Sequence, residues 1–324
     1  MNVYQMPIWE LQSLPGLKQV EARLRELSRG EDSWTPLFSD SVIRGGKRLR
    51  PAMVLLCGSF YASPQTELVD MATAIELIHT ASLVHDDVID HAASRRGHPT
   101  VSAKWGDHQA VLYGDFLFAR AFSLLTKHGQ VGVLENMTRA ISLMCEGEIE
   151  QAASRFNPNV TEADYISYIH KKTAYFISAC CLAGAEACDM PPAEKKALAT
   201  FGLQLGYAFQ MIDDLLDYTA NPGALGKPTL QDLKEGYLTL PVIRLLKEPR
   251  FALHVRKIIE NRDFTANNME FISRALQECG ILQQTQERAR TLIDRAKRNL
   301  EKLPQKPPKI ILSRLADYVV RRTC

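Results

Sequence analysis

Apolar residues recur at intervals of three and four along almost the whole of this 324-residue chain. This spacing is typical of helices that bury one face, and no run of alternating apolar and polar residues indicates a strand. The longer runs have about 25 residues, which corresponds to roughly 37 Å of helix. We therefore predict an all-α fold, a single-domain bundle over residues 1–324 with a deep apolar cleft at its centre. The predicted helices span residues 6–29, 35–44, 48–61, 65–90, 106–128, 130–155, 162–187, 192–219, 233–247, 250–261, 267–278, 281–302 and 309–322.

Composition and charge exclude several functional classes. The chain is 46% hydrophobic and 23% charged, and its net charge of +2 gives no indication of nucleic-acid binding. No stretch of about 20 apolar residues predicts a transmembrane helix, and the N-terminus lacks the basic region and apolar core of a secretory signal. The seven cysteines form no C-x-x-C pair. They are therefore interpreted as reduced core thiols of a cytoplasmic protein.

One acidic pattern occurs twice, as DDVID from Asp86 and as DDLLD from Asp213. Residues four apart share a helix face, so Asp86 lies beside Asp90 and Asp213 lies beside Asp217. Carboxylates at this spacing repel each other, and both copies end apolar runs where an uncompensated charge would cost several kcal/mol. A single copy would fit a solvated helix face. Two copies, which lie on different helices and can face each other across a bundle, predict Mg²⁺ sites that leave room for substrate phosphates.

A glycine-rich basic segment, GGKRLRP from Gly45 to Pro51, is the first candidate anion site. Gly46 lets the backbone approach a ligand closely. Lys47 and Arg50 lie three apart and share a face if a helix begins here. Arginine matches the geometry of phosphate oxygens, and lysine supplies a point charge. The alternative is an ordinary basic helix start, although it is poorly placed against the helix dipole unless it binds an anion.

Further basic and polar residues accompany the two acidic motifs. Arg95 and Arg96 follow the first motif within six positions, either to neutralise its carboxylates or to share a phosphate site with the metal. His79 lies two turns before Asp86 on nearly the same face, so a phosphate contact competes with a role in the core. Around the second motif lie Lys172 and Thr173 on a helix, Gln210 just before the motif, and Lys227 in the loop after it. Carboxylates, basic residues and Mg²⁺ together predict diphosphate chemistry by positioning and electrostatic stabilisation.

Seven segments in this order resemble the trans-isoprenyl diphosphate synthases over residues 44 to 243. They are GGKRLRP, HTASLVHDDVID, RRGHPT, GEIEQ, KKT, FQMIDDLLD and GKPTLQDLKEGYLTLP. Within this family the chain is most similar to medium- and long-chain bacterial polyprenyl synthases, and in particular to the catalytic subunit (component II) of heptaprenyl diphosphate synthases. The resemblance implies a helical bundle of the isoprenoid synthase type. It also implies a dimer, either of identical chains or with a small regulatory subunit.

The resemblance further implies which residues hold each substrate. Asp86, Asp90 and Asp213 would hold Mg²⁺, three ions when substrate is bound. Arg95, Lys172 and Lys227 would hold the diphosphate of the allylic substrate. Departure of that diphosphate leaves an allylic carbocation, the double bond of isopentenyl diphosphate attacks it, and a proton is lost to the leaving diphosphate. The isopentenyl diphosphate site would consist of Gly46, Lys47, Arg50, His79 and Arg96, and Thr173 and Gln210 would lie near the cation.

Product length is the least constrained property. Ala81 and Ser82 lie one turn before Asp86, where family members that stop at farnesyl usually carry an aromatic residue. Both are small, so we predict a longer product, about heptaprenyl, made from farnesyl diphosphate for the side chain of a respiratory quinone. The floor of the cleft would lie deeper, with Phe116, Phe118 and Phe122 as candidates that are equally suited to an ordinary core.

The alternative functions for the chain are a class I terpene cyclase and a homodimeric octaprenyl, solanesyl or geranylgeranyl synthase. A non-catalytic regulatory subunit would lack some of the Asp or Arg residues, and a purely structural bundle would not explain carboxylates in apolar runs.

Overall fold

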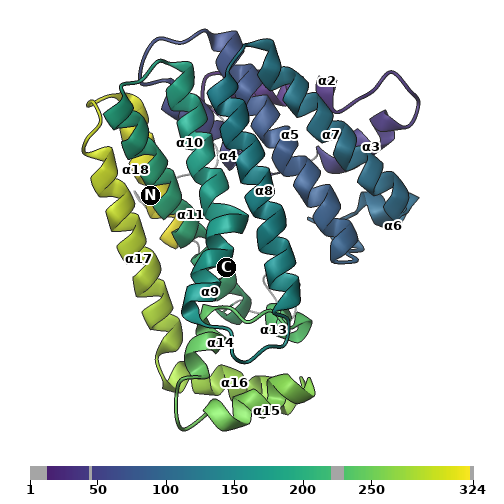
Figure 1. The fold of residues 1–324 in the computed structure, drawn as a ribbon, viewed down its shortest axis with the longest axis vertical. Coiled ribbons are helices and arrows are strands. Elements are labelled where there is room, and N and C mark those ends of the chain that lie inside the picture. Colours follow the sequence, from purple (N-terminus) through teal and green to yellow (C-terminus); the bar gives the residue numbers. More distant parts are fainter. Residues whose placement is uncertain (1–12, 44–45, 220–229, 322–324) are drawn as a thin grey trace. The chain divides into compact units, whose positions relative to one another are not determined.

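The computed structural model describes residues 13–43, 46–219 and 230–321. Apart from one hairpin of two-residue strands, the regular structure of these residues is helical (Figure 1), which confirms the predicted all-α fold. The chain divides into two compact units, which are described separately here. Unit 1 comprises residues 1–138, 179–198 and 304–312, and unit 2 comprises residues 139–178, 199–303 and 313–324. A single domain over the whole chain remains a prediction.

Unit 1 is organised around one long helix, α5 (Gln65–Ile89), which packs against α2, α4, α6 and α7. Nearly every face of α5 is buried, and its apolar residues are small or aliphatic, such as Ala72, Ile75 and Ile78. The other elements that lie wholly in this unit are α2 (Leu17–Leu27), α3 (Thr35–Val42), α4 (Leu49–Gly58), β1 (Ser94–Arg95), β2 (His98–Pro99), α6 (Val101–Trp105) and α7 (Asp107–Lys127).

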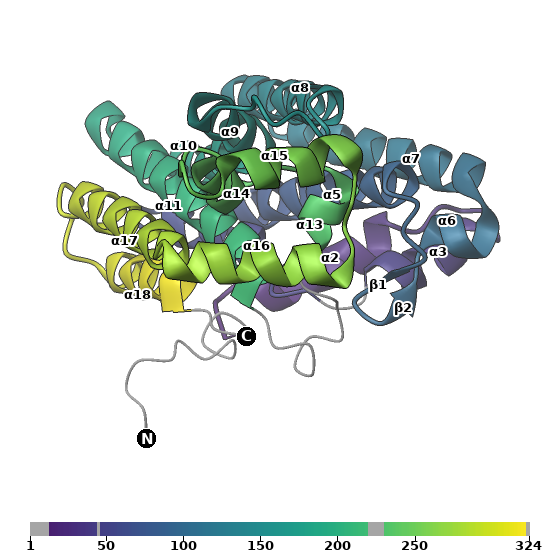
Figure 2. The ribbon, with the colours of Figure 1, turned by 90° about the horizontal axis from the view of Figure 1, so that it is seen from below.

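In unit 2, α14 packs against α9, α16 and α17, and α16 also packs against α17 (Figures 1 and 2). The elements that lie wholly in this unit are α9 (Glu162–Ile169), the π-helical turn η1 (His170–Ala174), α13 (Gln231–Glu235), α14 (Leu240–Leu245), α15 (Ala252–Asn261), α16 (Ala266–Glu278) and α17 (Ile281–Leu300). Four helices contribute residues to both units: α8 (Val131–Ala153), α10 (Tyr175–Ala187), α11 (Pro192–Thr219) and α18 (Pro307–Arg321).

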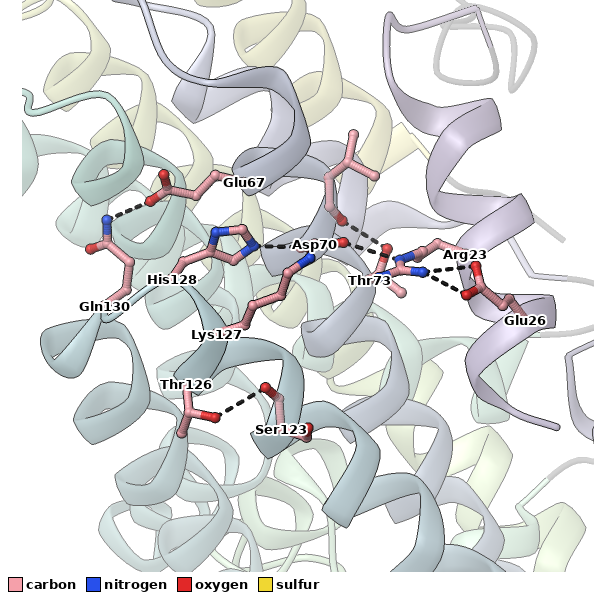
Figure 3. Close-up of polar contacts among 11 residues, drawn as sticks. Arg23, Glu26, Glu67, Asp70, Thr73, Ser123, Thr126, Lys127, His128 and Gln130 are labelled. Carbon is pink, nitrogen blue, oxygen red and sulfur yellow. Dashed lines mark hydrogen bonds and ion pairs between the residues drawn. The ribbon is translucent and has the colours of Figure 1, made fainter. Parts of the chain in front are cut away.

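Charged side chains on α5 are buried only where partners meet them. Asp70 accepts hydrogen bonds from Nε of Arg23 at 3.2 Å, from Nζ of Lys127 at 3.1 Å and from Nε2 of His128 at 2.8 Å (Figure 3). Burial opposes ionisation of this carboxyl group, but the hydrogen bonds from His128, Lys127 and Arg23 outweigh burial and lower its pKa. The cluster ties the N-terminal half of α5 to α2 and to the end of α7.

Most helix boundaries agree with the predictions within a few residues. The predicted helix 6–29 does not, because its residues 6–12 lie outside the described residues and α2 begins only at Leu17, after Gly16 at a φ of 88°. The predicted helix 162–187 contains the π-helical turn η1, and the predicted helix 233–247 is divided because Gly236, at a φ of 93°, ends α13. Thr161 is the N-cap of α9, in a capping box with Asp164. Of the cysteines predicted in the core, Cys145 is exposed. Among the described residues, none of the helices has the length and apolar character needed to cross a membrane.

Candidate active site

The first acidic motif forms the C-terminal end of α5. Asp90 caps this helix, and its N–H donates to the carbonyl of Asp86 at 2.8 Å, so the two carboxylates lie one turn apart. Asp86 is half-buried and Asp90 is exposed. Asp87 between them is buried, and its Oδ1 accepts a hydrogen bond from Nε of Arg95 at 2.7 Å. Burial raises the pKa of Asp87, and the charge of Arg95 opposes that rise. The middle carboxylate therefore anchors Arg95 beside the motif.

The hairpin after α5 separates two adjacent arginines. Its turn residues Arg96 and Gly97 have φ angles of 53° and 78°, and a tight two-residue turn of this kind needs positive φ at both positions. Arg95 pairs with Asp87, whereas the guanidinium of Arg96 lies beside Gly46. A Cβ on Gly46 would lie 2.8 Å from Nη1 of Arg96, and Gly46 has a φ of 110°. Glycine is thus required here both by the backbone conformation and by the approach of Arg96.

The segment that carries Lys47 and Arg50 differs from the prediction. We expected these residues to share a helix face if the helix began at this point, but α4 begins at Leu49 and exposed Lys47 precedes it. The cause is Arg48, which has a φ of 49° and a buried side chain. Its Nη1 donates to Glu76 of α5 at 3.0 Å and its Nη2 to the carbonyl of Ile43 at 2.6 Å. Arg48 therefore fixes the segment that carries Lys47 and Arg50 to α5.

Above this anchor, Nη1 of Arg50 lies 3.1 Å from Nε2 of His79. Burial lowers the pKa of His79 well below its usual value, and the charges of Arg50 and Arg96 lower it further. The imidazole is therefore neutral and accepts from Arg50. Burial raises the pKa of Glu76, and the surrounding arginines oppose the rise. Glu76 thus faces Arg48, Arg50 and Arg96, and half-buried Glu21 also pairs with Arg48. Two carboxylates meet three arginines, and the remaining positive charge favours an anion.

The second acidic motif lies near the end of α11 in unit 2, and its members differ in what they contact. Asp217 accepts from the backbone N–H groups of Gln231 at 3.0 Å and Asp232 at 3.2 Å, which ties the end of α11 to the start of α13. Asp214 is buried and accepts from Tyr165 and Gln210. Burial raises its pKa to about 6, and these two hydrogen bonds oppose the rise. Asp213 is half-buried.

The π-helical turn η1 carries Lys172 and Thr173. Such turns insert an extra residue into a helix and are frequent at functional sites. Here the turn lies close to α11, because a Cβ on Gly206 would lie only 2.5 Å from Cα of Ala174. Lys172 forms an ion pair with Glu148 of α8 at 2.5 Å. The hydroxyl of Thr173 donates to Oε1 of Gln210 at 2.7 Å, so these two predicted site residues are in direct contact.

Of the predicted site residues, unit 1 contains Gly46, Lys47, Arg50, His79, Asp86, Asp90, Arg95 and Arg96. Lys172, Thr173, Gln210 and Asp213 belong to unit 2, and Lys227 lies outside the described residues. Ala81 is fully buried, and the hydroxyl of Ser82 donates to the carbonyl of His79 at 2.9 Å. Their effect on product length remains a prediction. The sequence analysis did not assign a role in the site to Arg48, Glu76, Tyr165 or Asp214. The charge of Glu76 within a long apolar run could have indicated a buried ion pair.

Comparisons with known proteins identify the family. Residues 32–276 match the family model described as polyprenyl synthetase. An octaprenyl diphosphate synthase from Escherichia coli (strain K12) is 38% identical over 280 residues, which cover 86% of each chain. The heptaprenyl diphosphate synthase component 2 of Bacillus subtilis (strain 168) is 34% identical over 302 residues, which cover 92% of this chain and 86% of the relative. The chain belongs to the polyprenyl synthetase family. It is a trans-prenyltransferase that elongates allylic diphosphates to polyprenyl diphosphates, so the predicted family and enzyme class are confirmed.

A solved structure confirms the isoprenoid synthase fold of this polyprenyl synthetase. A polyprenyl synthase from Caulobacter crescentus CB15, complexed with calcium and isoprenyl diphosphate, is similar with a TM-score of 0.90 and 33% identity. The match covers 97% of this chain and 98% of that chain. The family match spans the segments around Arg50, Asp86 and Asp213 from which we predicted the site.

Proposed function

We propose that this polyprenyl synthetase is Mg²⁺-dependent and extends farnesyl diphosphate with isopentenyl diphosphate to about heptaprenyl length, for the side chain of a respiratory quinone. One observation carries the two-substrate assignment. In unit 1 one group of side chains is basic, with Arg50 against the neutral ring of His79 and Arg96 beside Gly46, and a second group is acidic, with Asp87 of the first motif bound to Arg95. One group suits a diphosphate held by side chains alone, and the other suits a diphosphate held through metal. A terpene cyclase, with one substrate, would not need both.

Isopentenyl diphosphate would bind to the cationic group. Arg50 and Arg96 present guanidinium groups that match phosphate oxygens, and exposed Lys47 adds a third charge. Neutral His79 orients Arg50 without adding repulsion, because its ring accepts from Nη1. The hydrogen bond from Arg48 to Glu76 fixes the segment that carries Lys47 and Arg50.

The residues of the acidic motifs fit Mg²⁺. Asp86, Asp90 and Asp213 supply hard oxygen ligands. In unit 2, burial raises the pKa of Asp232 to about 7, and the charges of Asp217 and Asp214 add to this rise. Across the described residues, no three acidic, histidine or cysteine side chains are arranged to hold a metal by themselves. Mg²⁺ sites commonly use one or two carboxylates and substrate phosphates. When bound, Mg²⁺ would neutralise the allylic diphosphate and improve it as a leaving group.

The protein's own residues position the reaction. Arg95, Lys172 and Lys227 would donate to the allylic diphosphate as its C–O bond breaks, since the leaving group takes the electron pair and gains charge. The double bond of isopentenyl diphosphate then forms the new C–C bond, and a proton passes from the adjacent carbon to the departed diphosphate. Thr173 and Gln210 would stabilise the cation through their oxygen atoms.

The chain would act as a dimer, with a small regulatory subunit or with a second copy of itself. The name of the Bacillus relative, component 2, implies that another component exists for that protein. On α7, Val111 and Leu112 are 41% and 56% exposed, and side chains of this kind suit a protein contact.

Purified chain incubated with farnesyl diphosphate, isopentenyl diphosphate and Mg²⁺ tests the proposal, with product length read after phosphatase treatment. Asp86→Ala and Asp213→Ala should each lower turnover by about 10²–10³-fold while the protein stays folded. Asp263→Ala, at an exposed residue outside both motifs, is the control. Near-wild-type turnover in either motif variant would contradict the assignment of that aspartate as a Mg²⁺ ligand. Efficient formation of one long product by the chain alone would refute the need for a different subunit and favour a homodimer.

A further inference from the structure

The acidic residue beside Asp213 has contacts unlike those of a metal ligand. Asp214 is only 6% exposed, and each of its carboxylate oxygens accepts a hydrogen bond from a protein donor. Oδ2 accepts from the hydroxyl of Tyr165 at 2.6 Å, and Oδ1 accepts from Nε2 of Gln210 at 2.8 Å. Successive residues of a helix point about 100° apart, so Asp214 faces a different side of α11 from Asp213.

The chemistry of a carboxylate fixes the direction of this network. An ionised carboxylate only accepts, so Gln210 must turn its NH₂ group toward Asp214. Its carbonyl oxygen then faces Thr173 and accepts from the threonine hydroxyl at 2.7 Å. The proton of Thr173 is thereby committed to Gln210, and the hydroxyl oxygen presents lone pairs to any other neighbour. If the amide were reversed, two acceptors would meet at Asp214, and Thr173 would be free to turn its proton outward.

We propose that Asp214 and Tyr165 form a positioning pair that fixes the amide of Gln210, and through it the hydroxyl of Thr173, so that oxygen lone pairs face the carbon from which the diphosphate departs. This inference rests on the proposed function, in which that carbon becomes a cation. A fixed oxygen dipole lowers the energy of a developing positive charge without reorganisation during the reaction. Asp214 acts through its neighbours, and Tyr165 holds the carboxylate in the orientation that Gln210 needs.

Substitutions at Asp214 separate this role from metal binding. Asp214→Leu keeps a side chain of similar shape but removes both acceptors, so kcat should fall by about 10²-fold, as when a preorganised dipole is lost. The KM for each substrate and the Mg²⁺ concentration for half-maximal rate should stay within about threefold of the wild-type values, because no substrate or metal contact is removed. Asp214→Asn should lose only about twofold, because its amide satisfies the network in either direction and the productive direction stays populated.

The matched control is the neighbouring residue. Asp213→Asn removes charge from a proposed metal ligand, so it should lose far more activity than Asp214→Asn and should raise the Mg²⁺ requirement. A metal role for Asp214 predicts that the two Asn variants behave alike, and that result would overturn the proposal. Thermal unfolding of every variant establishes that it is folded, and Tyr165→Phe supplies a second, milder perturbation, for which we expect a loss of kcat with unchanged KM values.

A double-mutant cycle decides whether Asp214 acts through Thr173. In a Thr173→Val background, Asp214→Leu should lower kcat by less than about threefold further, because the hydroxyl that it positions is already absent. Full additivity of the two losses would overturn the proposal. Absence of chain elongation by the wild-type enzyme, assayed in parallel with the same substrates, would instead overturn the proposed function and with it this inference. An active wild type with additive variants overturns the positioning role alone.

Discussion

Nη1 of Arg50 lies 3.1 Å from Nε2 of His79, a residue 29 positions away on another helix. The ring is half-buried, and desolvation together with the charges of Arg50 and Arg96 lowers its pKa and keeps it neutral, so it accepts from Arg50 and holds the guanidinium in one orientation. A preoriented arginine loses less conformational entropy when it binds phosphate oxygens. The contact therefore turns a basic helix start into a defined anion site.

Arg50→Ala should raise the KM for isopentenyl diphosphate by about 10- to 100-fold, the loss expected for a hydrogen bond between charged groups. The KM for the allylic substrate should change little. Arg50→Lys keeps the charge but not the fork of donors, so it should recover only part of the affinity. Initial rates with each substrate varied in turn give both constants. An unchanged KM for isopentenyl diphosphate in Arg50→Ala would contradict the assignment.

Arg95 and Arg96 are adjacent but should serve different substrates. Arg95 donates to Asp87 at 2.7 Å, whereas Arg96 lies beside Gly46. Arg95→Ala should therefore mainly raise the KM for the allylic diphosphate, and Arg96→Ala mainly that for isopentenyl diphosphate. Each variant is the control for the other, because both remove one guanidinium from the same hairpin. If both altered the same KM alone, the assignment of two separate sites would be wrong.

The local parts of this site were predictable from the sequence because each depends on residues close together in the chain. The spacing of Asp86 and Asp90 and the need for glycine at Gly46 follow from helix geometry and backbone sterics. The bundle itself follows from apolar periodicity, since the longest helices carry the clearest pattern.

The remaining features depend on contacts between distant residues. Glu76 meets Arg48 from 28 positions away, and Asp214 meets Tyr165 from 49 positions away. A sequence pattern shows that such a charge lies in an apolar run but does not name the partner that satisfies it. The π-helical turn at Thr173 was also missed, because it replaces one hydrogen-bonding pattern by another without a proline or glycine to mark it.

Gly114 of α7 makes room for the histidine that precedes the first acidic motif. A Cβ on Gly114 would lie 2.1 Å from Nε2 of His85, which also hydrogen-bonds the carbonyl of Val111 at 3.0 Å. Gly114→Ala should lower the free energy of unfolding by about 1–3 kcal/mol, as overpacking does, and should reduce turnover by shifting the end of α5 that carries Asp86.

Two variants sharpen this test. His85→Ala in the Gly114→Ala background removes the clash and should restore most of the lost stability in denaturant unfolding. Gly132→Ala of α8 is the matched control, because its added Cβ would lie at an ordinary 3.4 Å from Glu186. A Gly114→Ala protein as stable and active as Gly132→Ala would show that His85 does not occupy this space in solution.

The Asp70 cluster should make stability depend on pH in the acid range. Asp70→Asn should lower the free energy of unfolding at neutral pH by about 2 kcal/mol, because it removes the buried carboxylate that pairs with Arg23 and Lys127, although part of their charge is exposed to water. The pKa of Asp70 is lowered from 3.8. The unfolded chain therefore takes up the proton first, and the contribution is lost as pH falls below about 4 through the folded pKa.

Denaturant unfolding at several pH values measures this difference. The difference in the free energy of unfolding between wild type and Asp70→Asn should be largest at neutral pH and should decrease toward pH 3. Glu26→Gln is the control, because Glu26 pairs with Arg23 of the same cluster but is 63% exposed, so its loss should cost no more than about 1 kcal/mol. A difference in the free energy of unfolding that stayed constant down to pH 3 would show that Asp70 is not the titrating group.

Ala81 should limit the length of the product. It lies on α5 about one turn before Asp86 and is fully buried, so a larger side chain there must displace its neighbours or extend into the space that a growing chain occupies. Ala81→Phe should shorten the products to about farnesyl or geranylgeranyl length while the first condensation continues. The overpacking should also lower the free energy of unfolding by about 1–3 kcal/mol.

Ala81→Leu adds less volume than Ala81→Phe and should give products of intermediate length, so the two variants form a graded series. Product lengths are read by chromatography after phosphatase treatment. A folded Ala81→Phe enzyme with the wild-type product distribution would place the path of the growing chain away from this face of α5.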